Sequence, residues 1–550
     1  MAKPKGKSKK RFSKPRAPKD SSKNQRRDVE IADTADKALS TENDISWWTK
    51  YPQLAIDAGS LPMAYATGAP FSVSERGGSS YRTTVPGIIS LHFIPTYGTA
   101  RSATDPINIA ARNIYSFVRH ANSGSKNYDA PDLIMYLMGM DNAFAFHAFA
   151  RRIYGIARDF SPTNRYYSDK LLIANGLDPD DVYEHGAQLR YAINLMATKL
   201  GSLCVPSNMD IFVRHSWMSE GLYVDSASSK AQTYMFVPDG FWQVNVTGNT
   251  GTKLVYKPLQ KGFAMQVENF LTYFDELIAP LWGNEDFNIM SGDILKAYGD
   301  SGVMRLFTIP EDYAVLPTYS QEVLSEIENA LACPFDPEDA TNFEITQNPN
   351  ISQGYVAFDP TFPMTPVFFA GGDAALKVGS RRDYNLSNTI LNFHHDRPTP
   401  GEVLVASRMQ HTLNKVNDET VKFGTIGTEI VTHVVAWMIT PDNDGNDKGT
   451  AGFELPPTIG VVANTVSSSM PFEGFVYAAQ TMAVFSNFDW HPFSLISWYT
   501  RTDLNLWNAK WPTFFGDFDV YTTIDENTLQ RLHEVALLSV FDVPQAGLVK

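Results

Sequence analysis

The fold is decided by residues 105–157, which read DPINIAARNIYSFVRHANSGSKNYDAPDLIMYLMGMDNAFAFHAFARRIYGIA. Two consecutive helices are expected in this stretch. The first begins at Asp105 and Pro106, because aspartate is a favoured N-cap and proline suits the first helical position. It ends near the Asn-Ser-Gly sequence of residues 122–124. The apolar residues between these points recur at helical spacing on one face: Ile107, Ala110, Ala111, Ile114, Phe117, Val118 and Ala121.

The second helix is expected from Asp132 to about Arg158. Its sequence is apolar nearly all round, which is typical of a buried helix. At about 1.5 Å per residue it is roughly 40 Å long, enough to cross a domain. A membrane span is disfavoured, because Asp141 and the Arg151-Arg152 pair would then lie in hydrocarbon. We therefore expect the central helix of a large, predominantly α-helical body.

Charge is distributed very unevenly along the chain. Residues 1–27 contain one acid, Asp20, and twelve basic residues, so this segment carries a net charge of +11. The whole chain carries −14, so the rest of the chain carries −25. A basic tail on an acidic body suggests a polyanionic partner for the tail alone. The basic residues are Lys3, Lys5, Lys7, Lys9, Lys10, Arg11, Lys14, Arg16, Lys19, Lys23, Arg26 and Arg27.

Residues 1–45 are expected to form a disordered arm, because basic residues alternate with Pro, Ser and Gly and no apolar face can be buried. We expect the twelve basic side chains to bind RNA without sequence preference, since each phosphate contact releases a counterion. Phe12 is the only aromatic residue of the arm, so base stacking should contribute little. The alternative interpretation is a solvated tail or a localisation signal.

The composition indicates a large globular chain without disulfides. It has 550 residues, 43% of them hydrophobic, which is ample for a core and for more than one domain. Cys204 and Cys333 are the only cysteines, so a disulfide framework is excluded. The basic N-terminus has no apolar segment behind it, so no secretory signal is expected. No apolar run reaches 20 residues, so no stable membrane span is expected.

A short helix is expected over residues 43–59, with an apolar face that includes Trp47 and Trp48. A tryptophan pair beside a flexible arm is more often a docking element than part of a free-standing helix. We therefore expect Trp47 and Trp48 to lie at an interface.

The remaining chain divides into three parts by composition. Residues 46–334 are rich in helical patterns and form the first part of the body. Residues 335–480 are dense in Pro and Gly with short strand patterns, which indicates a β- and loop-rich projecting region. Residues 481–550 return to an aromatic-rich core pattern, and a final helix begins at Asp525. The overall class is α+β with helix predominating.

Several motifs approach those of enzymes without meeting them. In Gly248–Lys253, Thr252 stands where a phosphate-binding loop needs glycine, which favours a hairpin turn. Asp442–Asp447 lacks the glycine and glutamate of a calcium loop and favours a surface turn. The adjacent His394 and His395 point in different directions on a helix or strand. We therefore expect no catalytic residues, no metal site and no cofactor.

A set of short segments, in matching order from residue 50 to residue 545, resembles the capsid proteins of picobirnaviruses. None of these segments is a catalytic motif, and their specificity lies in the ordered set. They are Asp105–Ala111, Tyr115–Tyr136, Trp217–Asp225, Thr250–Val255, Asn284–Gly299, Ile345–Pro349, Gly427–Glu429, His533–Val535 and Phe541–Gln545.

This resemblance implies a mainly α-helical shell domain with a smaller outward projection. It implies intertwined dimers that build a small icosahedral shell around a segmented double-stranded RNA genome. The basic arm would face the RNA inside and could be trimmed from assembled particles, and assembly would take place in the host cytoplasm. On this reading, Trp47 and Trp48 anchor the arm at the dimer interface.

Two other classes of function stay open at this point. One is an RNA-binding protein outside any capsid, in which the body is a rigid scaffold for the arm. The other is an enzyme, such as a hydrolase with a dispersed site. Self-assembly into closed particles distinguishes the capsid protein from both.

Overall fold

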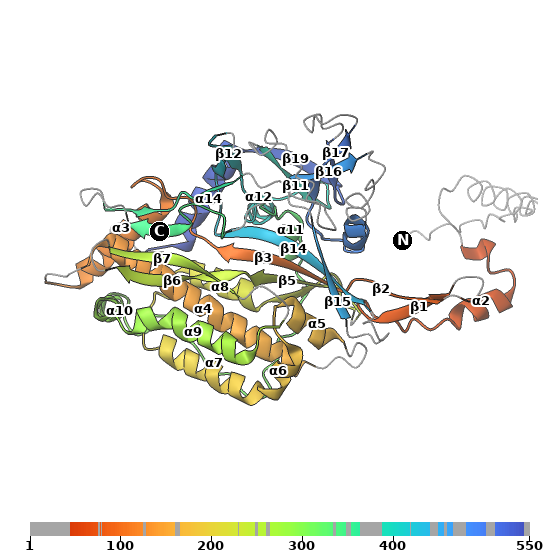
Figure 1. Cartoon of the computed structure of the whole chain (residues 1–550), viewed down its shortest axis with the longest axis horizontal. Helices are drawn as coiled ribbons and strands as arrows, with labels where there is room; N and C mark the ends of the chain where they lie inside the picture. Colours follow the sequence, from red (N-terminus) through yellow and green to blue (C-terminus); the bar gives the residue numbers. More distant parts are fainter. Residues whose placement is uncertain are drawn as a thin grey trace, which may run out of the picture. The chain divides into compact units, whose positions relative to one another are not determined.

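The computed structural model contains two compact units, Met1–Ala64 and Tyr65–Lys550 (Figure 1). It describes residues 45–543 with several gaps. The gaps are residues 75–77, 79, 125–127, 160–165, 229, 248–250, 260–263, 334–336, 348–353, 364–387, 418–419, 441–448, 456–458, 466–479 and 502–511.

Helix α4, Ala130–Arg158, runs through the middle of the larger unit (Figure 1). It is buried along almost its whole length, as its apolar sequence predicts. It begins two residues earlier than expected because Asp129 is the N-cap. The Asp129 carboxylate accepts from the backbone N–H of Asp132, and the Asp132 carboxylate accepts from that of Asp129, which forms a capping box. Helix α3, Pro106–Ala121, is confirmed and packs against α4.

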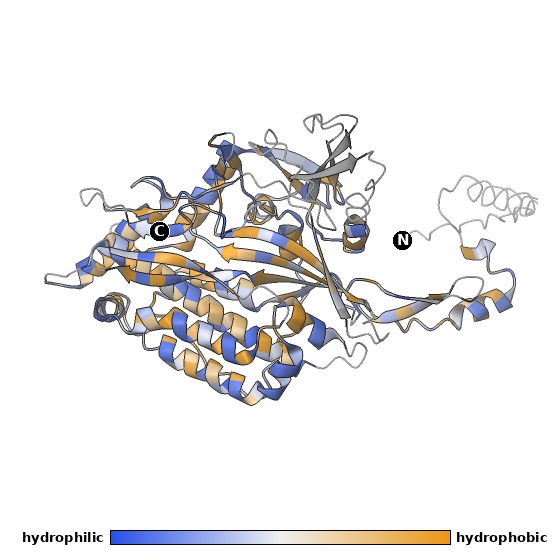
Figure 2. Cartoon of the chain, viewed as in Figure 1, coloured by the Kyte–Doolittle hydropathy of each residue, from blue (hydrophilic) through white to orange (hydrophobic). Residues whose placement is uncertain are grey.

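The other helices surround α4 or cover the far side of the main sheet. Helices α5 to α9 pack directly on α4. Figure 2 shows hydrophilic residues interspersed along α7 and α9, in contrast to the largely apolar α4. These helices are α5 Tyr167–Ala174, α6 Pro179–Glu184, α7 Gly186–Leu200, α8 Asp210–Glu220, α9 Val267–Trp282, α10 Glu285–Tyr298, α11 Gln321–Glu328, α12 Pro400–Ala406 and α14 Glu526–Val540.

The main sheet has five strands in the order β15-β14-β3-β5-β4. Strands β3 and β5 are parallel, and the other neighbours are antiparallel. The sequence predicts one strand over residues 83–95, but Pro86 interrupts it, so β2 ends at Thr84 and β3 begins at Ile88. The strands are β3 Ile88–Pro95, β4 Leu222–Val224, β5 Thr233–Pro238, β14 Glu429–Thr440 and β15 Gly449–Glu454.

Strand β3 is buried on both faces and lies between two apolar clusters. Ile88 and Ile94 pack into the larger cluster, which includes the side chains of α4. Ile89, Leu91 and Phe93 point the opposite way and pack into the second cluster, with residues of α11 and β14. Alternate side chains of a strand point to opposite faces, so one strand contributes to both clusters. The unit is therefore layered as helices, sheet and a mixed outer layer (Figure 1).

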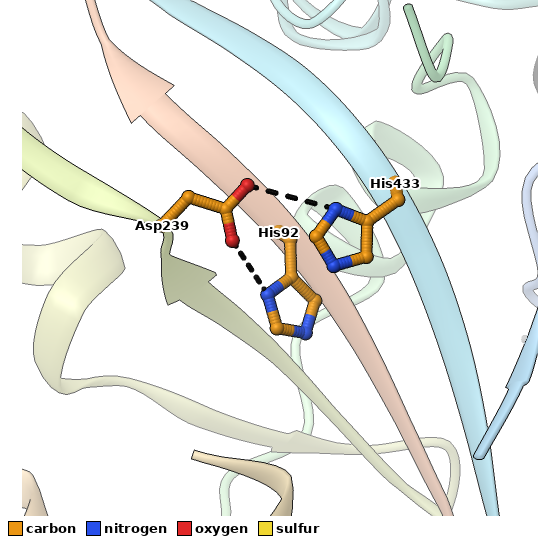
Figure 3. Close-up of side chains that lie close together, drawn as sticks. All are labelled: His92, Asp239 and His433. Atoms are coloured by element: carbon orange, nitrogen blue, oxygen red, sulfur yellow. Dashed lines mark hydrogen bonds and ion pairs between the residues drawn. The ribbon is translucent and has the colours of Figure 1, made fainter. Parts of the chain in front are cut away.

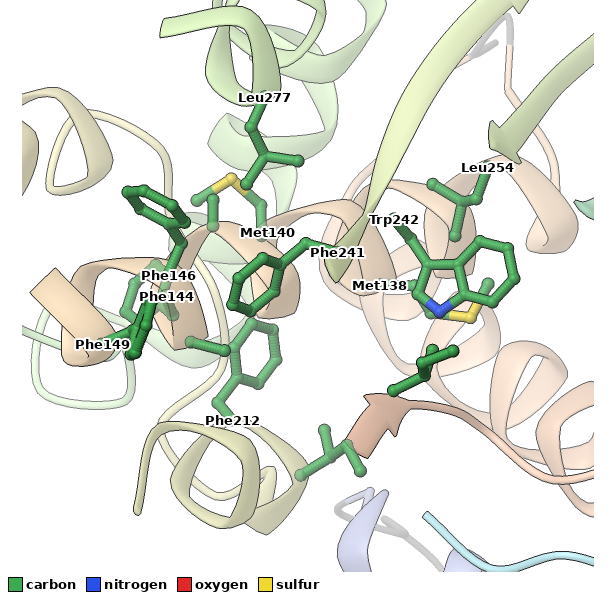
Figure 4. Close-up of a cluster of buried hydrophobic side chains, with 14 of the residues drawn as sticks. Met138, Met140, Phe144, Phe146, Phe149, Phe212, Phe241, Trp242, Leu254 and Leu277 are labelled. Atoms are coloured by element: carbon green, nitrogen blue, oxygen red, sulfur yellow. The ribbon is translucent and has the colours of Figure 1, made fainter. Parts of the chain in front are cut away.

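Aromatic rings form the centre of the larger cluster (Figure 4). The Phe146 ring of α4 lies 5.6 Å from that of Phe241, 4.7 Å from that of Phe270 and 5.4 Å from that of Tyr273, measured between centroids. These residues come from α4, the strand β6 and α9, so the rings join a helix, a strand and a second helix. Such pairs add about 0.5–1.5 kcal/mol beyond the area that they bury.

Smaller sheets complete the unit. Strands β6 and β7 form an antiparallel hairpin that pairs Thr247 with Gly251, which confirms the predicted hairpin turn. The orders are β1-β2, β6-β7-β8-β9, β10-β13-β12, β11-β19 and β16-β17-β18. The bounds are β1 Pro70–Ser74, β2 Ser80–Thr84, β6 Gly240–Thr247, β7 Gly251–Pro258, β8 Glu344–Gln347, β9 Val356–Ala357, β10 Thr361–Pro363, β11 Asn388–Phe393, β12 Leu413–Lys415, β13 Thr420–Phe423, β16 Ile459–Thr465, β17 Ser494–Arg501, β18 Pro512–Phe515 and β19 Val520–Asp525.

Helices and strands together make an α+β unit, and its sheets join parts of the chain that the sequence analysis separates. Strands β8 and β14 lie within residues 335–480, yet β8 pairs with β7 and β14 pairs with β3. The boundaries at 335 and 480 therefore do not separate these two strands from the helical body. Among the described residues, no helix combines the length and hydropathy that a membrane crossing requires.

Candidate assembly interface

The described part of the N-terminal unit contains a short turn, η1 Ile45–Trp47, and helix α2, Pro52–Gly59. The helix expected over residues 43–59 is thus confirmed in its second half. Neither element buries a residue. Trp47 and Trp48 are 49% and 60% exposed.

Exposed apolar side chains follow one another through this unit. Soluble chains rarely present contiguous apolar surface of this kind unless a partner covers it. The interface role of Trp47 and Trp48 stays a prediction, and the exposed apolar surface supports it. The large exposed apolar residues of this unit are Ile45, Trp47, Trp48, Tyr51, Leu54, Ile56, Leu61 and Met63.

The twelve basic residues of the arm, Lys3 to Arg27, lie outside the described residues. Of the expected arm, residues 1–45, only Ile45 is described. RNA binding and disorder of the arm stay predictions from composition.

The two adjacent arginines of α4 are paired inside the protein. Arg152 donates to the backbone oxygen of Phe236 and to Oδ1 of Asn175, and both donor–acceptor distances are 2.6 Å. Arg151 forms an ion pair with Glu220 at 2.7 Å. Buried charges are tolerated only when they are paired and hydrogen-bonded. These contacts explain why so apolar a helix contains two adjacent arginines.

A second buried charged group joins α8, α11 and β14. Arg214 forms a bidentate ion pair with Glu326 and another with Glu429. The shortest N–O distances are 2.5 Å to Glu326 and 2.7 Å to Glu429. Both carboxylates are almost fully buried. The guanidinium also lies over the Trp217 ring, 5.1 Å from its centroid. Sequence analysis did not identify this group, because its residues are more than a hundred positions apart.

His215, the residue after Arg214, is buried between Asp141 of α4 and the backbone oxygen of Thr428. Its Nδ1 lies 2.5 Å from Asp141 Oδ2, and its Nε2 lies 2.9 Å from the Thr428 oxygen. Burial lowers the pKa of His215, but Asp141 and the nearby Glu429 override it, so the net shift is upward. Both ring nitrogens face acceptors, which favours the charged imidazolium.

The adjacent histidines of the outer layer do not form a joint site. His394 pairs with Glu328 at 2.9 Å, whereas His395 pairs with Glu402 at 3.1 Å. The two rings thus have separate carboxylate partners, as their divergence along the chain predicts. The candidate calcium loop of residues 442–447 lies outside the described residues.

The described residues bring together a further group that the sequence did not reveal, and its side chains could hold a metal ion: His92, Asp239 and His433 (Figure 3). Both imidazoles point their Nδ1 atoms at the same carboxylate. The three residues come from β3, the β5–β6 junction and β14. No local sequence signal joins them, because the pairing of β3 with β14 alone brings the two histidines together.

Comparisons with known proteins identify the family. A model of the picobirnavirus capsid protein matches residues 47–493. A capsid protein precursor of human picobirnavirus (strain Human/Thailand/Hy005102/-) is 33% identical over 552 residues, covering 95% of each chain. The fold also matches the X-ray crystallographic structure of the picobirnavirus capsid, with a TM-score of 0.76, 22% identity, and coverage of 92% of this chain and 100% of that one.

These matches define a viral capsid protein, a component of the virion. The chain belongs to the picobirnavirus capsid protein family.

Proposed function

We propose that this chain self-assembles as dimers into a small icosahedral shell that encloses a segmented double-stranded RNA genome. The observation that carries the proposal is family membership across most of the chain. Closed shells reuse the same interfaces by symmetry, so a single chain can supply the whole shell. Assembly would take place in the host cytoplasm, before release in the virion.

The charge distribution supports a division of labour between arm and body. Residues 1–27 carry +11, enough to neutralise phosphates without reading sequence. The rest of the chain carries −25 and would repel the same RNA. We infer that the twelve basic residues face the genome and that trimming of the arm follows assembly. Residues 335–480, apart from the strands that join the body, supply the outward projection.

The full-length chain and a chain lacking residues 1–27 test this proposal together. We expect negative-stain electron microscopy to show uniform closed particles from both chains. RNA binding should be strong and salt-sensitive in the full-length chain, and most of it should be absent from the shortened one. A monomer or simple dimer at every salt concentration and pH would favour the RNA-binding scaffold instead. Strong salt-sensitive binding that survives the deletion would contradict the role of the arm.

The tryptophan pair offers a separate test of the dimer. We expect the double variant Trp47→Ala, Trp48→Ala to reduce dimer and shell yield about tenfold or more, because buried interface tryptophans commonly contribute about 2 kcal/mol or more. Analytical ultracentrifugation and particle counts measure the yield. The double variant Trp47→Phe, Trp48→Phe is the matched control and should keep most of it. Normal assembly of the alanine variant would refute the anchoring role.

A further inference from the structure

The His92, Asp239 and His433 cluster depends on an irregularity in the main sheet. Val431 pairs with Phe93, but the next pair along the strands is His433 with His92, so Thr432 is an extra residue in β14. In a regular antiparallel ladder Thr432 would stand opposite His92. The bulge instead sets His433 directly across from His92, and the two rings stack with centroids 4.0 Å apart. Bulges commonly redirect a side chain toward a functional position.

Asp239 approaches the same place from the junction between β5 and β6. Its backbone N–H donates to the Phe93 oxygen at 2.9 Å, and its backbone oxygen accepts from the Leu259 N–H at 2.8 Å. Two backbone hydrogen bonds therefore fix the position from which the carboxylate reaches the histidines. The Thr432 hydroxyl at the bulge donates to Oδ2 of that carboxylate.

The separations between the candidate ligand atoms fit a tetrahedral metal ion. Nδ1 of His92 lies 2.9 Å from Oδ1 of Asp239, and Nδ1 of His433 lies 3.6 Å from Oδ2. One ligand atom from each residue can be chosen so that all three lie within 4.8 Å of one another. Zinc bonds of about 2.0–2.1 Å separate neighbouring ligands of a tetrahedral site by about 3.3 Å. The two ring planes lie 16° apart in the stacked pair, so one or both imidazoles must turn out of this arrangement for both Nδ1 lone pairs to reach one ion.

The surroundings of His92 suit a metal ligand. Its Nε2 lies 3.2 Å from the Ser90 hydroxyl, and that hydroxyl oxygen accepts from the Trp437 indole N–H at 2.9 Å. An Nε2–H that donates to Ser90 leaves the Nδ1 lone pair for a metal. Such outer hydrogen bonds orient the histidines of most metal sites.

The access of solvent to the cluster also fits a metal site. The side chains of His92, Asp239 and His433 are 14%, 20% and 32% exposed, so an ion can enter from solvent and keep a water as its fourth ligand.

We propose that His92, Asp239 and His433 bind one divalent transition-metal ion of the zinc class, which joins β3, the β5–β6 junction and β14. Two imidazole nitrogens and one carboxylate oxygen favour Zn²⁺ over Ca²⁺ and Mg²⁺, which prefer oxygen donors alone. The role is structural, because the ion would link strands that are hundreds of residues apart in sequence.

The test is a titration of the purified full-length chain with ZnCl₂ after removal of metals by a chelator. We expect one tight Zn²⁺ per chain by calorimetry and elemental analysis, with no competition from millimolar Ca²⁺ or Mg²⁺. His433→Ala and Asp239→Asn should each weaken binding about tenfold or more. His395→Ala, which removes an imidazole outside the cluster, should leave binding unchanged.

Titration of the wild-type chain with Co²⁺ gives a readout that does not depend on the variants folding. The visible absorption of tetrahedral, nitrogen-ligated Co²⁺ should saturate at one ion per chain, and Zn²⁺ should abolish it. Binding without a stoichiometric plateau, or an octahedral Co²⁺ spectrum, would overturn the proposal. Equal Zn²⁺ affinity in wild type and a folded His433→Ala variant would do the same, and the cluster would then be a metal-free hydrogen-bonded group.

Discussion

Replacing Arg214 with methionine is expected to lower the free energy of unfolding by about 3–5 kcal/mol at neutral pH. The guanidinium neutralises two buried carboxylates, Glu326 and Glu429, and donates to both. Methionine fills a similar volume but leaves both negative charges close together without the guanidinium between them. Urea or guanidinium unfolding of the wild-type and variant chains measures the difference.

The pH dependence of this loss follows from the carboxylate pKa values. Burial raises the pKa of Glu429, but Arg214 and its other partners override it, so the net shift is downward. Its contribution to stability is therefore present above the ordinary carboxyl pKa of about 4.3 and is lost as pH falls through the lowered value. Without Arg214, burial raises the pKa of the two carboxyl groups, and their protonation removes the repulsion between the buried negative charges. The deficit of the variant should therefore begin to shrink above about pH 4.3, as its buried carboxylates become protonated, and should shrink further below that pH as the wild type loses the contribution of Glu429.

An exposed arginine provides the control for this prediction. Arg305 pairs with Asp300 at the surface, where both side chains are largely solvated. Arg305→Met should change the free energy of unfolding by less than about 1 kcal/mol. If Arg214→Met were equally mild at neutral pH, the buried charged group would not stabilise the fold.

Replacing Phe146 with alanine is expected to cost about 3–5 kcal/mol, because the ring is fully buried and its removal leaves a cavity. The ring packs against the Phe241 ring of β6 (Figure 4). It also packs against the Phe270 and Phe274 rings of α9. Its loss therefore weakens the packing of α4 against a sheet and a helix at once. Chemical denaturation, followed by tryptophan fluorescence, measures the change.

Tyr191 is the matched aromatic residue for comparison, since it lies exposed on α7. Tyr191→Ala should alter the free energy of unfolding by less than about 0.5 kcal/mol. A similar small effect of Phe146→Ala would mean that the aromatic cluster does not hold α4 in place.

Elements with strong local signals could be predicted from the sequence. Helix α4 follows from an apolar run with no polar face, and α3 from its cap and periodic stripe. The start of α14 after Asp525 also matches its expected position, because the cap residue marks it. The exposed Trp47 and Trp48 follow from the same kind of local reasoning. In each case a few neighbouring residues determine the structure.

Features that depend on distant pairings could not be predicted. The pairing of β14 with β3 depends on the assembly of the whole sheet, and no local sequence pattern near Glu429 predicts it. For the same reason the compositional boundaries at 335 and 480 cut across four sheets: the main sheet, β6-β7-β8-β9, β11-β19 and β16-β17-β18. The Arg214 group and the His92 cluster arise only after these strands meet. A local sequence pattern does not predict which distant charged residue will pair with a buried one.

The pairing of β3 with β14 also has a consequence for synthesis on the ribosome. Strand β3 emerges early, yet its neighbour β14 ends only at Thr440, so the sheet cannot close until most of the chain exists. At about 5–20 residues per second, the delay is roughly 20–70 seconds. For most of this interval the apolar α4 segment, which ends at Arg158, is already made and lacks part of its cover. Nascent capsid chains should therefore need chaperone protection, and truncated translation products should aggregate rather than join particles.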